Sequence, residues 1–329
     1  MLTASNEELH IMSDEEFAVQ IKDIEEALLS TVKTTSFETS DKKYSIRCKY
    51  FTTDEAKACI VIVHGFTEFL DKYYEMAHYC LQMGYNVFLY DQRGHGYSSR
   101  PADKGLIDID SFELYADDLA KYIGDIVEPM FPDLPIYLFS HSLGGTVSTL
   151  YLARPDCVAS RAVLSSPMIR PTTNGFPIFL ARAELRHNIR KHGKSAPFNH
   201  GRHFTPDVHF TLDNGSPSRL SHYLQMRIDD EHFQTCMATN SWIDQAFTCD
   251  KYMLDRKFLA NIKAEMLVFT AGRDTTVTIR EQYKYVKRLP NARRIHYPTS
   301  EHTIYATHYH NLLTYYHSLF CFLGDDTDK

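Results

Sequence analysis

The sequence lacks the cysteine pattern of a disulfide-bonded or zinc-binding protein. Its seven cysteines are scattered at positions 48, 59, 80, 157, 236, 249 and 321, without a C-x-x-C pair. An odd, scattered set is typical of free thiols in a reducing compartment rather than of a disulfide framework. Because structural zinc sites draw on closely spaced cysteines and histidines, the same pattern argues against zinc.

A secretory leader and a long apolar segment are also missing. Residues 1–20 carry five acidic side chains and no basic region followed by an apolar core, which argues against a signal peptide. No stretch reaches the apolar length that a membrane-spanning helix needs. We therefore expect a cytoplasmic protein.

The chain has no excess of positive charge. Its formal net charge is -7 over 329 residues, whereas general nucleic-acid binding needs a basic surface that displaces counterions. We therefore expect no nucleic-acid partner. Hydrophobic residues, in contrast, make up 43% of the chain, which is enough to build a large core.

Apolar runs alternate with amphipathic segments along most of the chain, which predicts a mainly parallel sheet with helices on both faces. The run 58–63 is almost wholly apolar, as expected of a strand that is covered on both faces. We expect strands at 44–51, 58–63, 86–90, 136–139, 162–164, 266–270 and 294–296, and helices at 13–30, 66–83, 111–130, 145–153, 278–288 and 303–320.

The alternation stops between residues 167 and 255 and then resumes. Such a block between two halves of a sheet indicates an insertion over the carboxyl edge, where ligands bind in open α/β sheets. We therefore expect an N-terminal helical extension over 1–34, an α/β core over 35–166 and 256–322, and a cap over 167–255.

A strand, a very tight turn and a helix meet at Ser140-His141-Ser142-Leu143-Gly144. This is the layout of a nucleophile elbow, which lifts the hydroxyl of its central residue, here Ser142, clear of the sheet. Gly144 is small, as the close approach of strand and helix demands, whereas Ser140 stands where glycine is usual. The alternative is an ordinary Ser/Gly loop.

A serine nucleophile needs a base, and the base needs an acid that holds it in the right tautomer. In this layout the acid and the base follow the serine in that order. Asp274 follows an apolar strand and a glycine turn, and His302 lies 28 residues later, before the last predicted helix. Asp274 could equally be a turn or helix-cap residue, and His296, His308 and His310 compete with His302.

Ester or amide hydrolysis also needs two amide donors for the developing oxyanion. We assign the N–H of Leu143, directly after the serine, and the N–H of Phe66, in the loop after the strand 58–63. The alternative for the second donor is that His64-Gly65 forms only a strand-to-helix turn.

Five motifs occur in a fixed order: His64-Gly65, the run D-Q-R-G-H-G-Y-S from Asp91 to Ser98, the run from Ser140 to Gly145, Gly272-Arg273-Asp274, and Glu301-His302. Over residues 35–320 they resemble the monoglyceride lipase and lysophospholipase branch of the α/β-hydrolases, and most closely the lysophospholipase L2 type. The resemblance implies an α/β-hydrolase fold, with a mostly parallel central sheet, helices on both faces and an inserted helical cap. It implies a serine carboxylester hydrolase of lysophospholipids or monoacylglycerols that uses no cofactor.

The resemblance also assigns roles to matching positions: Ser142 as nucleophile, Asp274 as acid, His302 as base, and the amides of Phe66 and Leu143 as oxyanion donors. It gives the Asp91–Ser98 run a structural role. The chain departs from the family pattern at Ser140, and it resembles the family only loosely over 167–255, which leaves the substrate open.

The first half of the cap is strongly basic. Between residues 170 and 203 there are seven Lys or Arg residues and one acidic residue, Glu184. We expect this stretch to meet an anionic membrane surface or a lipid phosphate, with Arg182 and Arg186 on the charged side and Phe176 and Phe179 guiding an acyl chain. The alternative is a solvated face that pairs with acidic residues of the core. His200 and His203 lack carboxylate or thiolate partners at ligand spacing, so we expect no metal.

Two other functions are compatible with parts of the sequence. An esterase of small substrates or an aminopeptidase would use the same catalytic set, and a peptidase would need cap carboxylates such as Asp229, Asp230 and Glu231 to hold a free amino group. A non-catalytic binding protein would have lost a member of the set, whereas all three are present.

Overall fold

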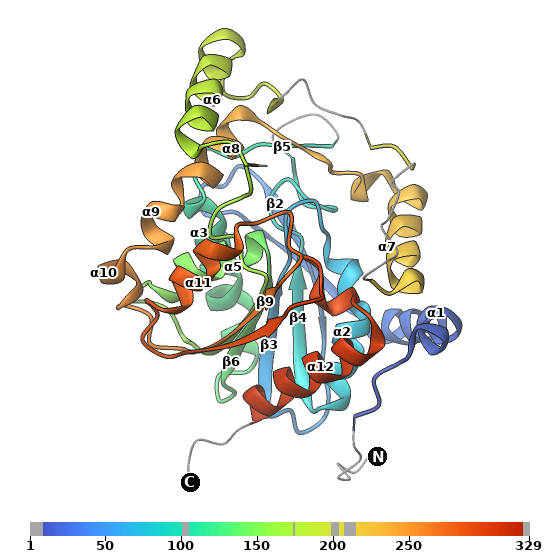
Figure 1. Ribbon diagram of the computed structural model, residues 1–329. Coiled ribbons are helices and arrows are strands. Elements are labelled where there is room, and N and C mark those ends of the chain that lie inside the picture. The colour runs from blue at the N-terminus through green and yellow to red at the C-terminus, as the bar shows by residue number, and fades with distance from the viewer. Residues whose placement is uncertain (1–8, 101–104, 174, 199–203, 207–214, 325–329) are drawn as a thin grey trace.

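A sheet of eight strands runs through the middle of the molecule (Figure 1). The computed structural model describes residues 9–100, 105–173, 175–198, 204–206 and 215–324. Strand β2 is antiparallel to β1 and β4, and the other neighbouring pairs are parallel. The order is β1 (Lys33–Glu38), β2 (Ser45–Phe51), β4 (Tyr85–Tyr90), β3 (Ala58–Val63), β6 (Ile136–His141), β7 (Ala159–Ser165), β9 (Glu265–Ala271) and β10 (Ala292–Tyr297).

Helices cover both faces of this sheet, each over its own buried apolar cluster. One face carries α3 (Glu113–Tyr122), α5 (Leu143–Leu152) and α11 (Ile279–Val286). The other carries α2 (Tyr74–Gln82) and α12 (Tyr309–Gly324), with α1 (Asp14–Thr31) packed against α2. Every residue of β3, β4 and β6 is buried. The predicted mostly parallel sheet with helices on both faces is confirmed.

The cap lies between β7 and β9 and divides into two parts in Figure 1. In one part α6 (Ile178–His192) packs on α8 (Asn240–Thr248), followed by α9 (Asp250–Met253) and α10 (Arg256–Leu259). In the other, α7 (Pro217–Asp229) and the 3-10 turn η4 (Glu231–Phe233) lie on the α1 side. A short parallel pair, β5 (Leu106–Ile107) with β8 (Met237–Ala238), joins the cap to the core.

A buried ion pair fixes α7 to the core. The Arg219 side chain is 0% exposed, and its Nε lies 2.9 Å from Oε2 of Glu75 on α2. Its Nη2 also donates to the carbonyl oxygen of Met12 at 2.9 Å. A guanidinium held by carboxylate and carbonyl in this way has its charge and its donors satisfied. Helix α7 therefore has a fixed position against α1 and α2.

Most predicted elements are present within a few residues, and several stretches differ from the prediction. Residues 64–69 form a loop rather than a helix, and in this loop the Gly65 N–H donates to the Glu68 carboxylate at 2.6 Å. The 3-10 turn η1 (Leu70–Tyr73) follows the loop and leads into α2. Strand β1 was not predicted. The segment predicted as helix from 303 contains the 3-10 turn η5 (Ile304–Ala306) before α12 begins, so His308 precedes the helix. The expected helix over 111–130 continues past α3 through the π-helical η2 (Ile123–Val127) and α4 (Glu128–Met130).

No helix in the described ranges has both the length and the apolar character needed to span a bilayer.

The turn between β6 and α5 brings two backbones very close together. Ser142 at its apex has a φ of 51°, in the left-handed region that side chains rarely adopt. A Cβ on Gly144 would lie 2.0 Å from the carbonyl oxygen of Val63 at the end of β3. Ser140, the departure from the usual motif, is accommodated because its Oγ bonds to that of Ser148 on α5 at 2.6 Å.

We expect Gly144→Ala to lower the free energy of unfolding by about 3 kcal/mol, because the new methyl group meets backbone rather than a flexible side chain. The matched control is Gly124→Ala in η2, where an added Cβ meets nothing within 4 Å. That change should stabilise the chain by about 0.5 kcal/mol. Urea unfolding of both variants measures the difference; equal stabilities would show that the turn tolerates a larger residue.

Candidate active site

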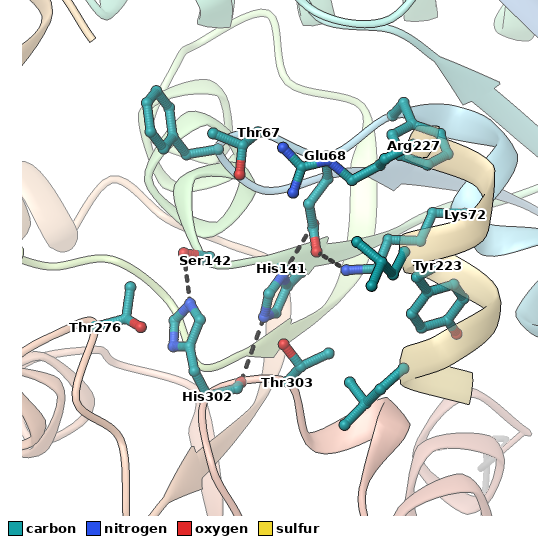
Figure 2. Close-up of a pocket in the computed structure, with 14 residues that line it drawn as sticks. Thr67, Glu68, Lys72, His141, Ser142, Tyr223, Arg227, Thr276, His302 and Thr303 are labelled. Carbon is teal, nitrogen blue, oxygen red and sulfur yellow. Dashed lines mark hydrogen bonds and ion pairs between the residues drawn. The ribbon is translucent and has the colours of Figure 1, made fainter. Parts of the chain in front are cut away.

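Three side chains from distant parts of the chain meet at the carboxyl edge of the sheet. Ser142 follows β6, Asp274 follows β9, and His302 follows β10. Loops at this edge are where ligands bind in open parallel sheets. The structure thus brings together the three residues that the sequence order selects, as Figure 2 shows for Ser142 and His302.

Hydrogen bonds connect the three side chains in one line. Nε2 of His302 lies 2.8 Å from Oγ of Ser142, and Nδ1 of the same ring lies 2.8 Å from Oδ2 of Asp274. A carboxylate only accepts, so it selects the ring tautomer with hydrogen on Nδ1. The other ring nitrogen is then free to take a proton from the serine hydroxyl.

Asp274 also serves the loop it lies in. Its Oδ1 accepts the backbone N–H groups of Thr276 and Val277 at 2.9 and 3.0 Å, and its side chain is fully buried. Asp274 therefore has both the turn role considered from the sequence and the contact with His302. Each role uses a different oxygen of its carboxylate. Of the competing histidines, His296 lies in β10 with its Nδ1 3.0 Å from Oγ1 of Thr270.

Two backbone donors lie beside Ser142. Leu143 is the first residue of α5, where helical N–H groups have no partner in the preceding turn. Phe66 lies in the loop after β3 and lines the same cavity as Ser142. Within the described ranges, no acceptor takes the N–H of either residue. Among the described residues, both N–H groups are thus without an acceptor: one directly follows Ser142 and the other belongs to a residue of the same cavity.

A cavity of about 320 Å³ opens beside Ser142 and His302. Its apolar wall consists of Phe66, Phe69, Leu220 and Leu224, and its polar wall includes Glu68, Lys72, His141, Tyr223 and Arg227. The cavity thus offers both an apolar and a charged surface within reach of one hydroxyl.

Glu68 is the centre of a buried network under this cavity. Its carboxylate accepts the Gly65 N–H and the hydroxyls of Tyr73 and Tyr305 at 2.6 to 2.7 Å, and it pairs with Lys72 Nζ at 2.5 Å. Nδ1 of His141, the neighbour of Ser142, lies 3.0 Å from the same group (Figure 2). Burial raises the pKa of the Glu68 carboxyl, but His141 and Lys72 outweigh burial and hold it well below the usual value.

The sequence did not reveal this network. Glu68 and Lys72 stand four residues apart with opposite charges, a spacing that usually marks only a surface pair on a helix. Tyr223 and Arg227 come from α7, in the part of the cap where the sequence offered no signal.

The cap residues proposed to meet substrate do not reach the cavity. Phe176 and Phe179 are 68% and 66% exposed at the start of α6, and neither lines the cavity beside Ser142. Arg182 pairs with Asp250 of α9 at 3.2 Å and donates to the Phe247 carbonyl, so both partners lie within the cap and neither is a core residue. Arg186 is exposed on α6.

Within the described ranges, no group of three or more His, Cys, Asp or Glu side chains has an arrangement suited to a metal ion. His200 and His203 lie outside these ranges.

Comparisons with known proteins show the family to which the chain belongs. Residues 54–313 match the Hydrolase_4 family, described as serine aminopeptidase, S33. A probable lysophospholipase L2 of Haemophilus influenzae is 28% identical over 240 residues, which is 71% of this chain and 73% of the relative. Mouse monoglyceride lipase is 32% identical over 123 residues, but these span only 37% of this chain and 39% of that enzyme.

The fold is shared with a solved structure. A soluble variant of monoglyceride lipase from Saccharomyces cerevisiae, in complex with a substrate analog, superposes with a TM-score of 0.70 at 16% identity. The match covers 88% of this chain and 94% of that structure. At this identity the similarity concerns the fold alone.

We expect Glu68→Gln to lower the free energy of unfolding at pH 7 by about 3 kcal/mol, because it leaves Lys72, whose side chain is only 13% exposed, without its counter-charge. The pKa of Glu68 is lowered by folding, so its contribution is complete above about 4.5 and is lost as the pH falls through the folded value. The unfolding free energy of the unsubstituted protein should therefore drop more steeply in acid than that of the variant.

Glu26→Gln, at an exposed position on α1, is the matched control. It should change neither the free energy of unfolding at pH 7 nor the steepness of its fall in acid. Parallel acid profiles for the Glu68 variant and the unsubstituted chain would show that the network does not depend on the ionised carboxylate.

Proposed function

The chain belongs to the Hydrolase_4 family of serine hydrolases, and from this we propose that it cleaves the acyl ester of monoacyl lipids through an acyl-enzyme on Ser142. The observation that carries the proposal is the line of hydrogen bonds from Ser142 through His302 to Asp274, at 2.8 Å each. This line provides the base and the orienting acid that a serine hydroxyl needs at neutral pH.

The proposed reaction has two halves. His302 takes the Ser142 proton as Oγ attacks the ester carbonyl, and the oxyanion accepts hydrogen bonds from the amides of Phe66 and Leu143. The protonated imidazole then gives its proton to the leaving alcohol. In the second half a water molecule, deprotonated by His302, releases the fatty acid and restores the serine.

The substrate class is proposed from the relatives and the cavity together. The relatives are named lysophospholipase L2 and monoglyceride lipase, so a lysophospholipid or a monoacylglycerol is the proposed substrate. The apolar wall beside Ser142, from Phe69 to Leu220 and Leu224, supports an acyl chain in the cavity.

Aminopeptidase activity is the second candidate, because the family description includes it. A peptidase would need a free carboxylate for the substrate ammonium. Glu68 is the carboxylate that lines the described part of the cavity, and its charge is taken by Lys72. Asp230 accepts the Tyr97 hydroxyl at 2.5 Å and lies outside the cavity lining. These contacts favour the ester.

Ser142→Ala should abolish labelling by a fluorophosphonate and lower ester hydrolysis by at least about 1,000-fold, because the probe and the substrate need the same hydroxyl. Ser166→Ala, a buried serine just after β7, is the control and should label normally. Hydrolysis of monoacylglycerol, lysophosphatidylcholine and an aminoacyl arylamide by the unsubstituted protein separates lipase from peptidase. Absence of labelling in that protein would favour a non-catalytic role.

We also propose that α6 touches an anionic membrane at its cytoplasmic face. Phe176, Phe179 and Leu180 are exposed at its N-terminal end, and Arg186, Arg190 and Lys191 are exposed along it. Apolar side chains beside cations are typical of helices that lie in the membrane interface. Arg182 is not part of this surface because it pairs with Asp250.

The double charge reversal Arg186→Glu with Arg190→Glu should weaken binding to phosphatidylserine-containing vesicles by about 10-fold or more, since each basic residue near such a surface contributes about 1 kcal/mol. Arg256→Glu with Lys257→Glu on α10 makes the same charge change at other exposed positions and should bind almost normally. Co-sedimentation with vesicles measures both, and equal losses would indicate a general charge effect only.

A further inference from the structure

Arg227 is a cation in the cavity wall that the proposed reaction does not use. It lies near the end of α7, and Figure 2 shows its side chain reaching from that helix toward Thr67 and Glu68. The same cavity contains Ser142 and His302. Since Arg219 holds α7 against the core, the Arg227 guanidinium is presented from a fixed helix.

The guanidinium is oriented but not neutralised. Nε donates to the carbonyl of Phe233 at 3.0 Å and Nη2 to that of Thr235 at 2.8 Å. The Phe204 ring packs on its face with a centroid distance of 4.6 Å. Two of the five N–H groups of a guanidinium are thus used, which leaves three for a ligand. No carboxylate in the described ranges forms an ion pair with it.

Among the described residues, the neighbouring charges do not supply a counter-charge for the Arg227 guanidinium. Glu68 is the nearest acidic wall residue, but its carboxylate already receives Lys72, two tyrosine hydroxyls and a backbone N–H. Lys72 and Glu68 cancel in charge, so Arg227 leaves this wall with a net positive charge. Burial lowers the pKa of Arg227, and Cys236 and Glu68 offset only part of this effect. An anion in the cavity would supply the missing compensation.

We infer that Arg227 binds the phosphate of a lysophospholipid headgroup and so selects phosphate-bearing monoacyl lipids over neutral monoacylglycerols. The planar fork of an arginine matches two phosphate oxygens, which gives both affinity and orientation. The assignment rests on the proposed function, since it concerns the alcohol half of the ester cleaved at Ser142. Phosphate and scissile ester would then lie in one cavity of about 320 Å³.

The test compares lysophosphatidylcholine with monoacylglycerol of the same acyl chain. Arg227→Gln should lower kcat/KM for the lysophospholipid by about 10- to 100-fold, mainly through KM, and change that for monoacylglycerol by less than about twofold. Arg227→Lys keeps the positive charge but lacks the planar fork. Its kcat/KM for the lysophospholipid should therefore lie between those of Arg227→Gln and the unsubstituted protein. Arg256→Gln, which removes the same charge at an exposed position on α10, should behave like the unsubstituted protein in detergent solution, without vesicles.

Competition tests the site without relying on a variant. Glycerophosphocholine should inhibit monoacylglycerol hydrolysis by the unsubstituted protein at concentrations where glycerol does not. Inorganic phosphate, the other source of the same anion, should inhibit more weakly. Inhibition by phosphate as strong as that by glycerophosphocholine would overturn the headgroup assignment in favour of a free-phosphate site.

The outcomes separate this inference from the proposed function. Equal losses on both substrates in Arg227→Gln, or turnover of monoacylglycerol without lysophosphatidylcholine by the unsubstituted protein, would overturn the role of Arg227 and leave the lipid esterase standing. Hydrolysis of neither lipid by the unsubstituted protein would overturn both.

Discussion

The close approach of α5 to the end of β3 is the constraint on which the site depends. Gly144 lies against the Val63 carbonyl with no room for a side chain, and this contact sets the path of the turn that carries Ser142. The loop that follows Val63 supplies Phe66. One backbone contact therefore fixes the turn that carries Ser142 against the strand whose following loop contains Phe66. The strained φ of 51° at Ser142 is tolerated because strand and helix on either side are fully buried.

Glu68 lines the cavity and contacts side chains from parts of the chain that are far apart in the sequence. It receives Tyr73 from η1 and Tyr305 from η5, while His141 contacts it from the end of β6. Nε2 of His141 lies 3.4 Å from the carbonyl oxygen of His302. The carboxylate thus connects the loop that contains Phe66 with the end of β6 and with the segment that carries His302 and Tyr305. The remaining cation of this polar wall, Arg227, comes from α7, which the Arg219–Glu75 pair holds in place.

The fold was readable from the sequence because its central strands are apolar throughout, as at Ala58–Val63, and because strands and helices alternate. Ser142, Asp274 and His302 could be selected because loops at one sheet edge must converge, so chain order suffices. Strand β1 was missed since its residues are mostly exposed. Glu68 and Arg227 could not be found because their contacts join segments with no common periodicity. The pairing of Arg182 could not be predicted because its partner Asp250 belongs to another cap helix.

The attachment of α7 to Met12 and Asp14 connects the N-terminal part of the described chain with a cavity wall far from it in the sequence. Ser218 donates its hydroxyl to the Asp14 carbonyl at 2.7 Å, and Arg219 reaches Met12. Truncation of the chain to the start of the sheet would remove these contacts with α7, the helix that carries Tyr223 and Arg227. Such shortening would therefore reach the cavity wall that Tyr223 and Arg227 form beside Ser142.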